Sequence, residues 1–164
     1  MTRLLTLLAW ALPLAAQQQG PPPCLAPEHR QFDFWIGTWD VFARGRQVGE
    51  NVIDTLYGGC VLRERYTTAP RPYAGSSFNI FDAARGVWHQ TWVDTGGLLL
   101  LIEGGLRNGS MVMEGETAGR NGPVRNRISW TPIARDSVRQ HWETWSDSAG
   151  TWVTAFDGMY VRRN

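Results

Sequence analysis

Residues 87–94 read Val87-Trp88-His89-Gln90-Thr91-Trp92-Val93-Asp94, and this stretch alternates between two kinds of side chain. Successive residues of a β-strand point to opposite faces, so both tryptophans would lie on one face together with Gln90. His89 would lie on the other face. The stretch therefore predicts a strand with one aromatic face, and the same pattern can be followed outward along the chain.

Ten segments with a period of two follow one another after residue 37. Turn residues rich in Gly, Pro, Asn and Asp separate them, and Asn-Gly and Gly-Gly suit tight hairpins. No long helical period occurs, although Pro27–Ile36 could hold a helical turn or two. The predicted strands are Thr38–Ala43, Gln47–Leu56, Cys60–Thr67, Ser76–Asp82, Val87–Asp94, Leu98–Leu106, Ser110–Ala118, Val124–Thr131, Ser137–Ser146 and Thr151–Arg162.

Consecutive hairpins without crossover helices predict an all-β, antiparallel, up-and-down arrangement. About ten strands in one small domain must either close on themselves or form two layers. Closure removes the exposed sheet edges, so we expect an up-and-down β-barrel, with a two-layer sandwich as the alternative.

Length and composition exclude several classes of protein. The 164 residues, 43% of them apolar and 19% charged, suit one packed domain. The net charge is +1 and no basic stripe is present, so a nucleic-acid partner is not expected. After the N-terminal segment, no apolar run is long enough to cross a membrane as a helix.

The N-terminal segment has the three-part pattern of a secretory signal. One positive charge at Arg3 precedes the apolar run Leu4–Leu14, and small residues follow at Ala15-Ala16. We therefore expect residues 1–16 to be a signal peptide, 17–31 a flexible Gln/Pro-rich leader, and 32–164 the barrel domain. This organisation predicts a periplasmic or secreted protein.

Export affects how Cys24 and Cys60 are interpreted. In an oxidising compartment an isolated pair is most simply one disulfide, and two buried thiols are the alternative. Without a supporting cluster of histidines, the two cysteines do not predict a zinc site. No metal site is expected elsewhere.

The alternation also predicts which side chains face the barrel interior. This interior is aromatic, with Trp92 and Trp142 as members, and contains a few polar groups. An unpaired buried polar group costs about 1–3 kcal/mol, so these groups must pair with each other, with water or with a ligand. The predicted ligand-binding residues are Glu64, Asn79, Gln90, Trp92, Gln140 and Trp142. Asn79 has the weakest support, because Phe78 and Ile80 are apolar and lie on the opposite face.

A resemblance to a known family begins at Phe32-Asp33-Phe34-Trp35-Ile36-Gly37-Thr38-Trp39-Asp40. The Gly37-x-Trp39 pair resembles the opening signature of lipocalin-like (calycin) barrels. The longer pattern is similar to exported bacterial proteins with a lipocalin- or nitrobindin-like domain. Further matching stretches include Gly59–Glu64, Gly75–Asn79, Val138–Glu143 and Phe156–Tyr160. The resemblance implies a barrel and no particular reaction. It also implies that Trp39 stacks under an Arg of the last strand, Arg162 or Arg163.

Three functions are consistent with this sequence. The first is a non-catalytic exported barrel that binds a small apolar or aromatic molecule in a Trp-lined cavity. The second is an enzyme of the cyclase or isomerase type that uses Glu64 as acid or base in the same cavity. The third is an interaction module whose interior is filled with side chains.

Haem is the one cofactor that the resemblance suggests, through an axial histidine as in nitrobindin-like barrels. The chain has three histidines, His29, His89 and His141. The alternation places His89 and His141 on faces opposite the Trp-rich interior, and His29 precedes the barrel. The sequence therefore gives haem little support and does not determine the oligomeric state.

Overall fold

The computed structural model describes residues 24–68, 72–120 and 122–163, which form ten β-strands and three short 3₁₀ turns. The turns are η1 (Pro27–Arg30), η2 (Asp33–Trp35) and η3 (Tyr57–Gly59). The strands are β1 (Gly37–Ala43), β2 (Arg46–Leu56), β3 (Val61–Thr67), β4 (Ala74–Asp82), β5 (Val87–Asp94), β6 (Leu99–Arg107), β7 (Ser110–Gly119), β8 (Gly122–Ala134), β9 (Ser137–Ser146) and β10 (Thr151–Arg162).

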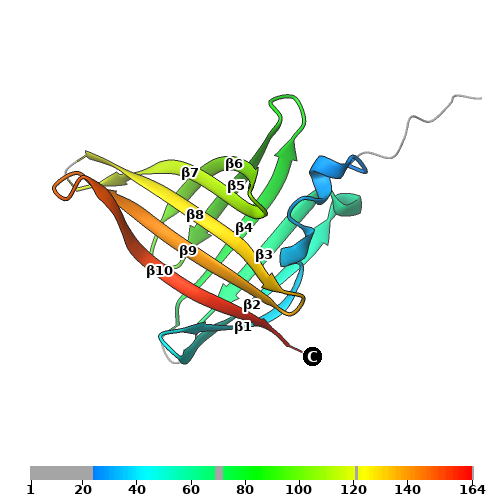
Figure 1. Cartoon of the computed structure of the whole chain (residues 1–164), viewed down its shortest axis with the longest axis horizontal. Helices are drawn as coiled ribbons and strands as arrows, with labels where there is room; N and C mark the ends of the chain where they lie inside the picture. Colours follow the sequence, from blue (N-terminus) through cyan, green and yellow to red (C-terminus); the bar gives the residue numbers. More distant parts are fainter. Residues whose placement is uncertain (1–23, 69–71, 121, 164) are drawn as a thin grey trace, which may run out of the picture.

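Every strand pairs antiparallel with its neighbour in sequence, and β1 also pairs with β10, so the sheet is a closed barrel (Figure 1). The closing register places Trp39 opposite Arg162 and Val41 opposite Tyr160. All ten predicted strands are present, and their ends differ from the prediction by at most three residues. The predicted up-and-down barrel is confirmed, and the two-layer alternative is wrong.

One end of the barrel is closed by the N-terminal segment. The turns η1 and η2 lie at the same end as the C-terminus (Figure 1). They bury Phe32 and Trp35 completely, and these rings stack on each other at 4.9 Å and contact Trp130 at 5.2 and 5.3 Å. The Trp88 Nε1 donates a hydrogen bond to the Glu28 carbonyl at 3.2 Å. Aromatic side chains therefore fill this half of the barrel.

At this closed end the Arg162 guanidinium lies 4.2 Å from the centre of the Trp39 ring, a cation–π contact. The Trp39 indole donates to the Trp35 carbonyl at 2.9 Å. A Cβ at Gly37 would overlap the Arg162 guanidinium, and the Gly37 φ of +147° disfavours any other residue. The Gly37-x-Trp39 pattern thus has a physical role: the glycine leaves room for the cation above the tryptophan.

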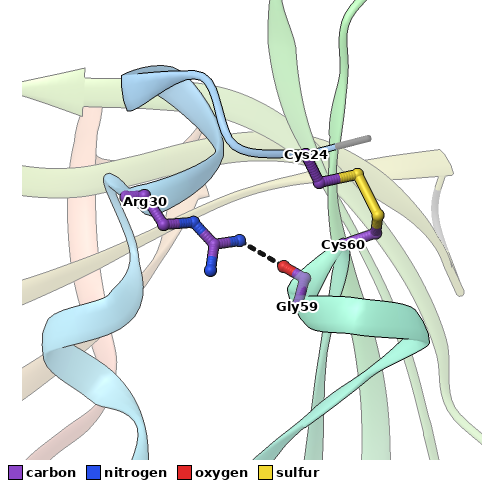
Figure 2. Close-up of a disulfide and its surroundings, with 4 residues drawn as sticks. All are labelled: Cys24, Arg30, Gly59 and Cys60. Atoms are coloured by element: carbon purple, nitrogen blue, oxygen red, sulfur yellow. Dashed lines mark hydrogen bonds between the residues drawn. A yellow bond between two sulfur atoms is a disulfide. The ribbon is translucent and has the colours of Figure 1, made fainter. Parts of the chain in front are cut away.

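Cys24 and Cys60 form a disulfide that joins the N-terminal segment to the start of β3, as the sequence predicts (Figure 2). The Arg30 guanidinium donates to the Gly59 carbonyl in the same place (Figure 2). In contrast to the flexible leader predicted for residues 17–31, residues 24–31 are folded onto the barrel and contain η1. Residues 1–23, which include the predicted signal peptide, lie outside the described residues.

Trp88 and Gln90 share one face of β5 and are both buried, as the alternation in residues 87–94 predicts. Met111 and Met113 on β7, Ile128 and Trp130 on β8, and Val138 on β9 are buried too. The described residues include no helix long and apolar enough to cross a membrane.

Candidate functional site

A cavity of about 290 Å³ occupies the half of the barrel that the N-terminal segment does not fill, and it is partly open to solvent. Six aromatic side chains line it, together with three polar side chains that the sequence analysis placed in the interior. Its walls consist of Glu64, Tyr66, Thr68, Tyr73, Gln90, Trp92, Leu100, Ile128, Gln140, Trp142, Ala155, Phe156 and Tyr160.

Glu64 on β3 is the centre of the polar part of the site. It is 3% exposed, and its two carboxylate oxygens accept hydrogen bonds from neighbouring strands. Asn51 Nδ2 on β2 donates to Oε1 at 2.7 Å, and Ser77 Oγ on β4 donates to Oε2 at 2.7 Å. Both donors are neutral, so the carboxylate has no cationic partner within the described part of the chain.

The hydrogen bonds continue on both sides of Glu64. On one side, Asn79 Nδ2 donates to Ser77 Oγ at 2.9 Å, and Gln90 Nε2 donates to Asn79 Oδ1 at 2.8 Å. On the other side, the Tyr160 hydroxyl donates to Gln140 Oε1 at 2.5 Å and lies 3.4 Å from Asn51 Nδ2. This polar belt joins six strands of the closed sheet: β5, β4, β3 and β2 on one side of β1, and β10 and β9 on the other.

Three amide atoms of the belt have no hydrogen-bond partner among the described residues: the buried Asn51 Oδ1 and one atom each of Gln90 and Gln140. Gln90 uses its Nε2 on Asn79 and Ser77, which leaves its Oε1 as an available acceptor. Gln140 uses its Oε1 on Tyr160, which leaves its Nε2 as an available donor. Both residues line the cavity. The site therefore offers a bound molecule one hydrogen-bond acceptor and one donor besides Glu64.

Burial raises the pKa of Glu64 to about 7, against the lowering effect of the hydrogen bonds from Ser77 and Asn51. Burial, with the nearby charge of Glu64, also raises the pKa of Tyr160 well above its usual range. Glu64 is therefore the group at this site that changes its charge near neutral pH. A carboxyl with such a pKa can hold or release a proton under physiological conditions.

The aromatic walls are fixed by hydrogen bonds at their polar edges. Trp92 Nε1 donates to Asp94 Oδ2 at 3.1 Å, and the Tyr73 hydroxyl donates to the same oxygen at 2.7 Å. Trp142 Nε1 donates to Asn126 Oδ1 at 2.9 Å. Because these N–H and O–H groups are engaged by the protein, a molecule in the cavity meets mainly ring surface.

Asp94 connects two aromatic side chains of the cavity wall to the loop that follows β5. Its Oδ1 also accepts the backbone N–H groups of Gly96 and Leu98 at 2.8 and 3.1 Å. Partial burial acts to raise the pKa of Asp94, but the hydrogen bonds from Tyr73, Trp92 and the backbone hold it below its usual range. Asp94 is a fixed carboxylate that orients two aromatic side chains.

The structure brings five of the six predicted binding residues to one cavity: Glu64, Gln90, Trp92, Gln140 and Trp142. Asn79 is buried with the same belt but does not line the cavity, and it holds Gln90 in place. Sequence reasoning missed Asn51 and Ser77, which hold Glu64, and it missed Tyr73, which precedes β4. The signal for Ser77 was its place two residues before Asn79, on the same face.

All three histidines are described, and none lines the cavity. His89 contacts Glu103 at 3.0 Å and Thr91 at 2.8 Å, and His141 contacts Thr154 at 3.0 Å. His29 lies in η1, and its ring centre is 5.0 Å from that of Phe81. The cavity therefore offers no imidazole to a haem iron. The described residues also contain no group of three or more His, Cys, Asp or Glu side chains that could hold a metal ion.

Comparison with known proteins adds no relative: no family profile matches the chain, and no curated protein matches its sequence. The likeness to lipocalin-like barrels thus rests on the sequence motifs, and the closed ten-strand barrel is what the structure shows.

Proposed function

We propose that this protein binds a small, largely apolar or aromatic molecule in the open half of the barrel. The observation that carries the proposal is the cavity of about 290 Å³ with six aromatic side chains in its walls. This volume is close to about 300 Å³, the lower end of the range for small-molecule sites. The interaction module considered above has an interior filled with side chains, and such a barrel would leave no such space.

The lining residues would divide the work of binding. Trp92, Trp142 and the tyrosines supply apolar contact area, and their polar edges are already satisfied by the protein. Gln90 and Gln140 supply one acceptor and one donor, which orient the molecule. Glu64 marks the base of the site. A few polar groups at fixed positions in an otherwise apolar cavity are typical of sites for small molecules.

A second candidate is an enzyme that uses Glu64 as general acid or base, as in a cyclase or isomerase. Its support is the pKa of Glu64, raised to about 7 by burial, in a residue that lines the cavity. Asp94 does not serve as a second acid, because four donors fix it as a carboxylate. For this function, Glu64→Gln should abolish turnover while the molecule still binds.

We also propose that the protein acts outside the cytoplasm, in the periplasm or after secretion. The Cys24–Cys60 disulfide supports this, since such bonds persist mainly in oxidising compartments. The N-terminal pattern over residues 1–16 supports it from the sequence.

A titration with the neutral fluorophore N-phenyl-1-naphthylamine tests the binding function. We expect fluorescence to rise and saturate at one molecule per protein. Leu100→Trp places a larger ring in the cavity wall and should weaken binding by tenfold or more. Leu101→Trp is the matched control, because Leu100 is buried and lines the cavity while Leu101 is 46% exposed on the outer face.

Both variants must show the circular dichroism spectrum and the cooperative unfolding of the natural protein. Two results contradict the proposal. One is the absence of saturable binding to the natural protein. The other is equal binding by the folded Leu100→Trp and Leu101→Trp variants, which would place the fluorophore outside the cavity.

A further inference from the structure

Glu64 is the only Asp, Glu, Arg or His side chain that is buried among the described residues. Other carboxylates pair with arginine on the outer surface of the barrel. Asp54 contacts Arg63 at 2.7 Å, and Asp157 contacts Arg139 at 2.8 Å. Glu64 has only Asn51 and Ser77, which are neutral. A buried carboxylate without a counter-charge is costly in its ionised form, so a cation that reaches it gains unusually strong attraction.

The cavity around Glu64 suits a positive charge and contains none of its own. Neither Arg nor His occurs among its lining residues. Its walls include Trp92 and Trp142, whose N–H groups are turned to Asp94 and Asn126. The remaining ring surface has the negative potential that attracts an ammonium group, an interaction worth about 0.5–2 kcal/mol. The Glu64 carboxylate and the tryptophan rings therefore both favour a ligand with a positive charge.

Gln90 adds a third feature. Because its Nε2 donates to Asn79, its free Oε1 is an acceptor on the cavity wall. An ammonium group has three donors, and the carboxylate of Glu64 has capacity left beyond its two present hydrogen bonds. Gln90 Oε1 is therefore an acceptor for a donor group of the ligand on the same cavity wall as Glu64.

We propose that the ligand of this cavity is an organic amine, whose ammonium group pairs with Glu64 and whose apolar or aromatic part packs against the Trp92 and Trp142 rings. This inference rests on the proposed binding function and specifies its ligand class. A carboxylate ligand would meet the charge of Glu64 without a compensating cation. A neutral ligand would leave that carboxylate as costly as before.

The charge of Glu64 makes amine binding depend on pH. The other titratable groups at the site are Asp94 at the rim and three tyrosines, Tyr66 on its own strand, Tyr73 before β4 and Tyr160 on β10. Hydrogen bonds hold the pKa of Asp94 below its usual range, and burial raises the pKa of all three tyrosines. Asp94 therefore stays ionised and the tyrosines stay neutral between pH 5.5 and 8, so Glu64 alone changes charge. Its pKa of about 7 leaves a few per cent ionised at pH 5.5 and most at pH 8. Amine affinity should therefore rise more than tenfold over that interval.

Isothermal titration calorimetry with matched probes tests the inference. The amines are phenethylamine and tryptamine, the neutral counterparts are 2-phenylethanol and tryptophol, and the anions are 3-phenylpropanoate and indole-3-propanoate. At pH 8 we expect at least one amine to bind tenfold or more tightly than its neutral and anionic counterparts. Glu64→Gln should remove this preference while the alcohol still binds. Glu116→Gln removes an exposed carboxylate of β7 and should keep the preference.

The outcomes separate the two proposals. If an alcohol or an anion binds as tightly as the amine, the amine inference is wrong and the cavity remains a binding site. The same conclusion follows if Glu64→Gln keeps the preference, or if amine affinity does not change between pH 5.5 and 8. If none of the six probes binds and the fluorophore also fails, the binding function itself is wrong.

Discussion

Single side chains decide the electrostatic character of this barrel, and Glu64 is the clearest case. Its pKa in the folded protein is raised by burial to about 7, whereas an exposed glutamate has a value of 4.5. Between these values the folded protein binds more protons than the unfolded chain. The stability that Glu64 contributes is therefore fully present below pH 4.5 and is lost as the pH rises through 7.

The loss of stability with rising pH gives a prediction for Glu64→Gln. The natural protein should lose about 3 kcal/mol of unfolding free energy between pH 4.5 and 8 through this one group. The glutamine variant should show a flatter dependence on pH, because it has no proton to lose. Urea unfolding at several pH values measures both slopes, and Glu116→Gln on the outer surface should keep the natural slope. Parallel curves for Glu64→Gln and the natural protein would contradict the burial of an ionisable Glu64.

The inward placement of Glu64, Gln90 and Gln140 could be predicted from the sequence, because each shares a face with large apolar neighbours. Prediction from the sequence failed for Ser77 and gave Asn79 little support, for a physical reason. On β4 the apolar residues Phe78 and Ile80 are 52% and 39% exposed on the outside, while Ser77 and Asn79 are buried. The polar belt inverts the usual alternation there, and nothing in a single strand reveals that a neighbouring strand carries a buried carboxylate.

At the level of the strands, glycines make space for the aromatic walls. A Cβ at Gly75 on β4 would overlap the Trp92 ring of β5, and a Cβ at Gly158 on β10 would overlap the Phe156 ring. The large ring and the missing side chain occupy adjacent places on the inner face. The shape of the cavity thus depends on where strands lack a side chain as well as on where they carry one.

We expect Gly75→Ala to displace the Trp92 ring, since the added methyl group cannot share its position. The variant should lose about 1–3 kcal/mol of stability and should bind N-phenyl-1-naphthylamine several times more weakly. Gly105→Ala on β6 is the matched control, because a Cβ there would meet no atom within 4 Å. Chemical unfolding and the fluorescence titration provide the two measurements. Equal effects of both alanines would show that the contact with Trp92 does not constrain the wall.

The strands could be predicted from the sequence, and so could the short helical turns within Pro27–Ile36, but the packing of the N-terminal segment against the barrel could not. Strands β5, β9 and β10 have the predicted bounds because alternation and turn residues determine them locally. The turns η1 and η2 have only four and three residues and no period. These two turns are held in place by the burial of Phe32 and Trp35 inside a barrel whose strands come from residues far along the chain. They are also held by the disulfide, whose 37-residue loop is worth about 3–4 kcal/mol in the chain-entropy model.

The whole molecule has two halves that share one set of strands. Phe32, Trp35, Trp39, Trp88 and Trp130 fill the closed half, and the cavity occupies the other. The volume of a cavity is the volume that the barrel encloses minus the volume of the side chains that all ten strands turn inward. Inspection of any single segment therefore could not decide between a filled and a hollow barrel. Both expectations describe part of this protein.

This division predicts that stability and binding respond to different tryptophans. Trp35→Ala removes a ring at the centre of the closed half and should cost about 3–5 kcal/mol, with the affinity of the folded protein for N-phenyl-1-naphthylamine within twofold of natural. Trp92→Ala removes a wall of the cavity, so we expect a tenfold weaker affinity and a smaller loss of stability. Urea unfolding and titration at a temperature where both variants are folded measure the two effects. If Trp35→Ala abolished binding by folded protein, or Trp92→Ala left it intact, the two halves would not be independent, because rings in the closed half would then be shaping the site.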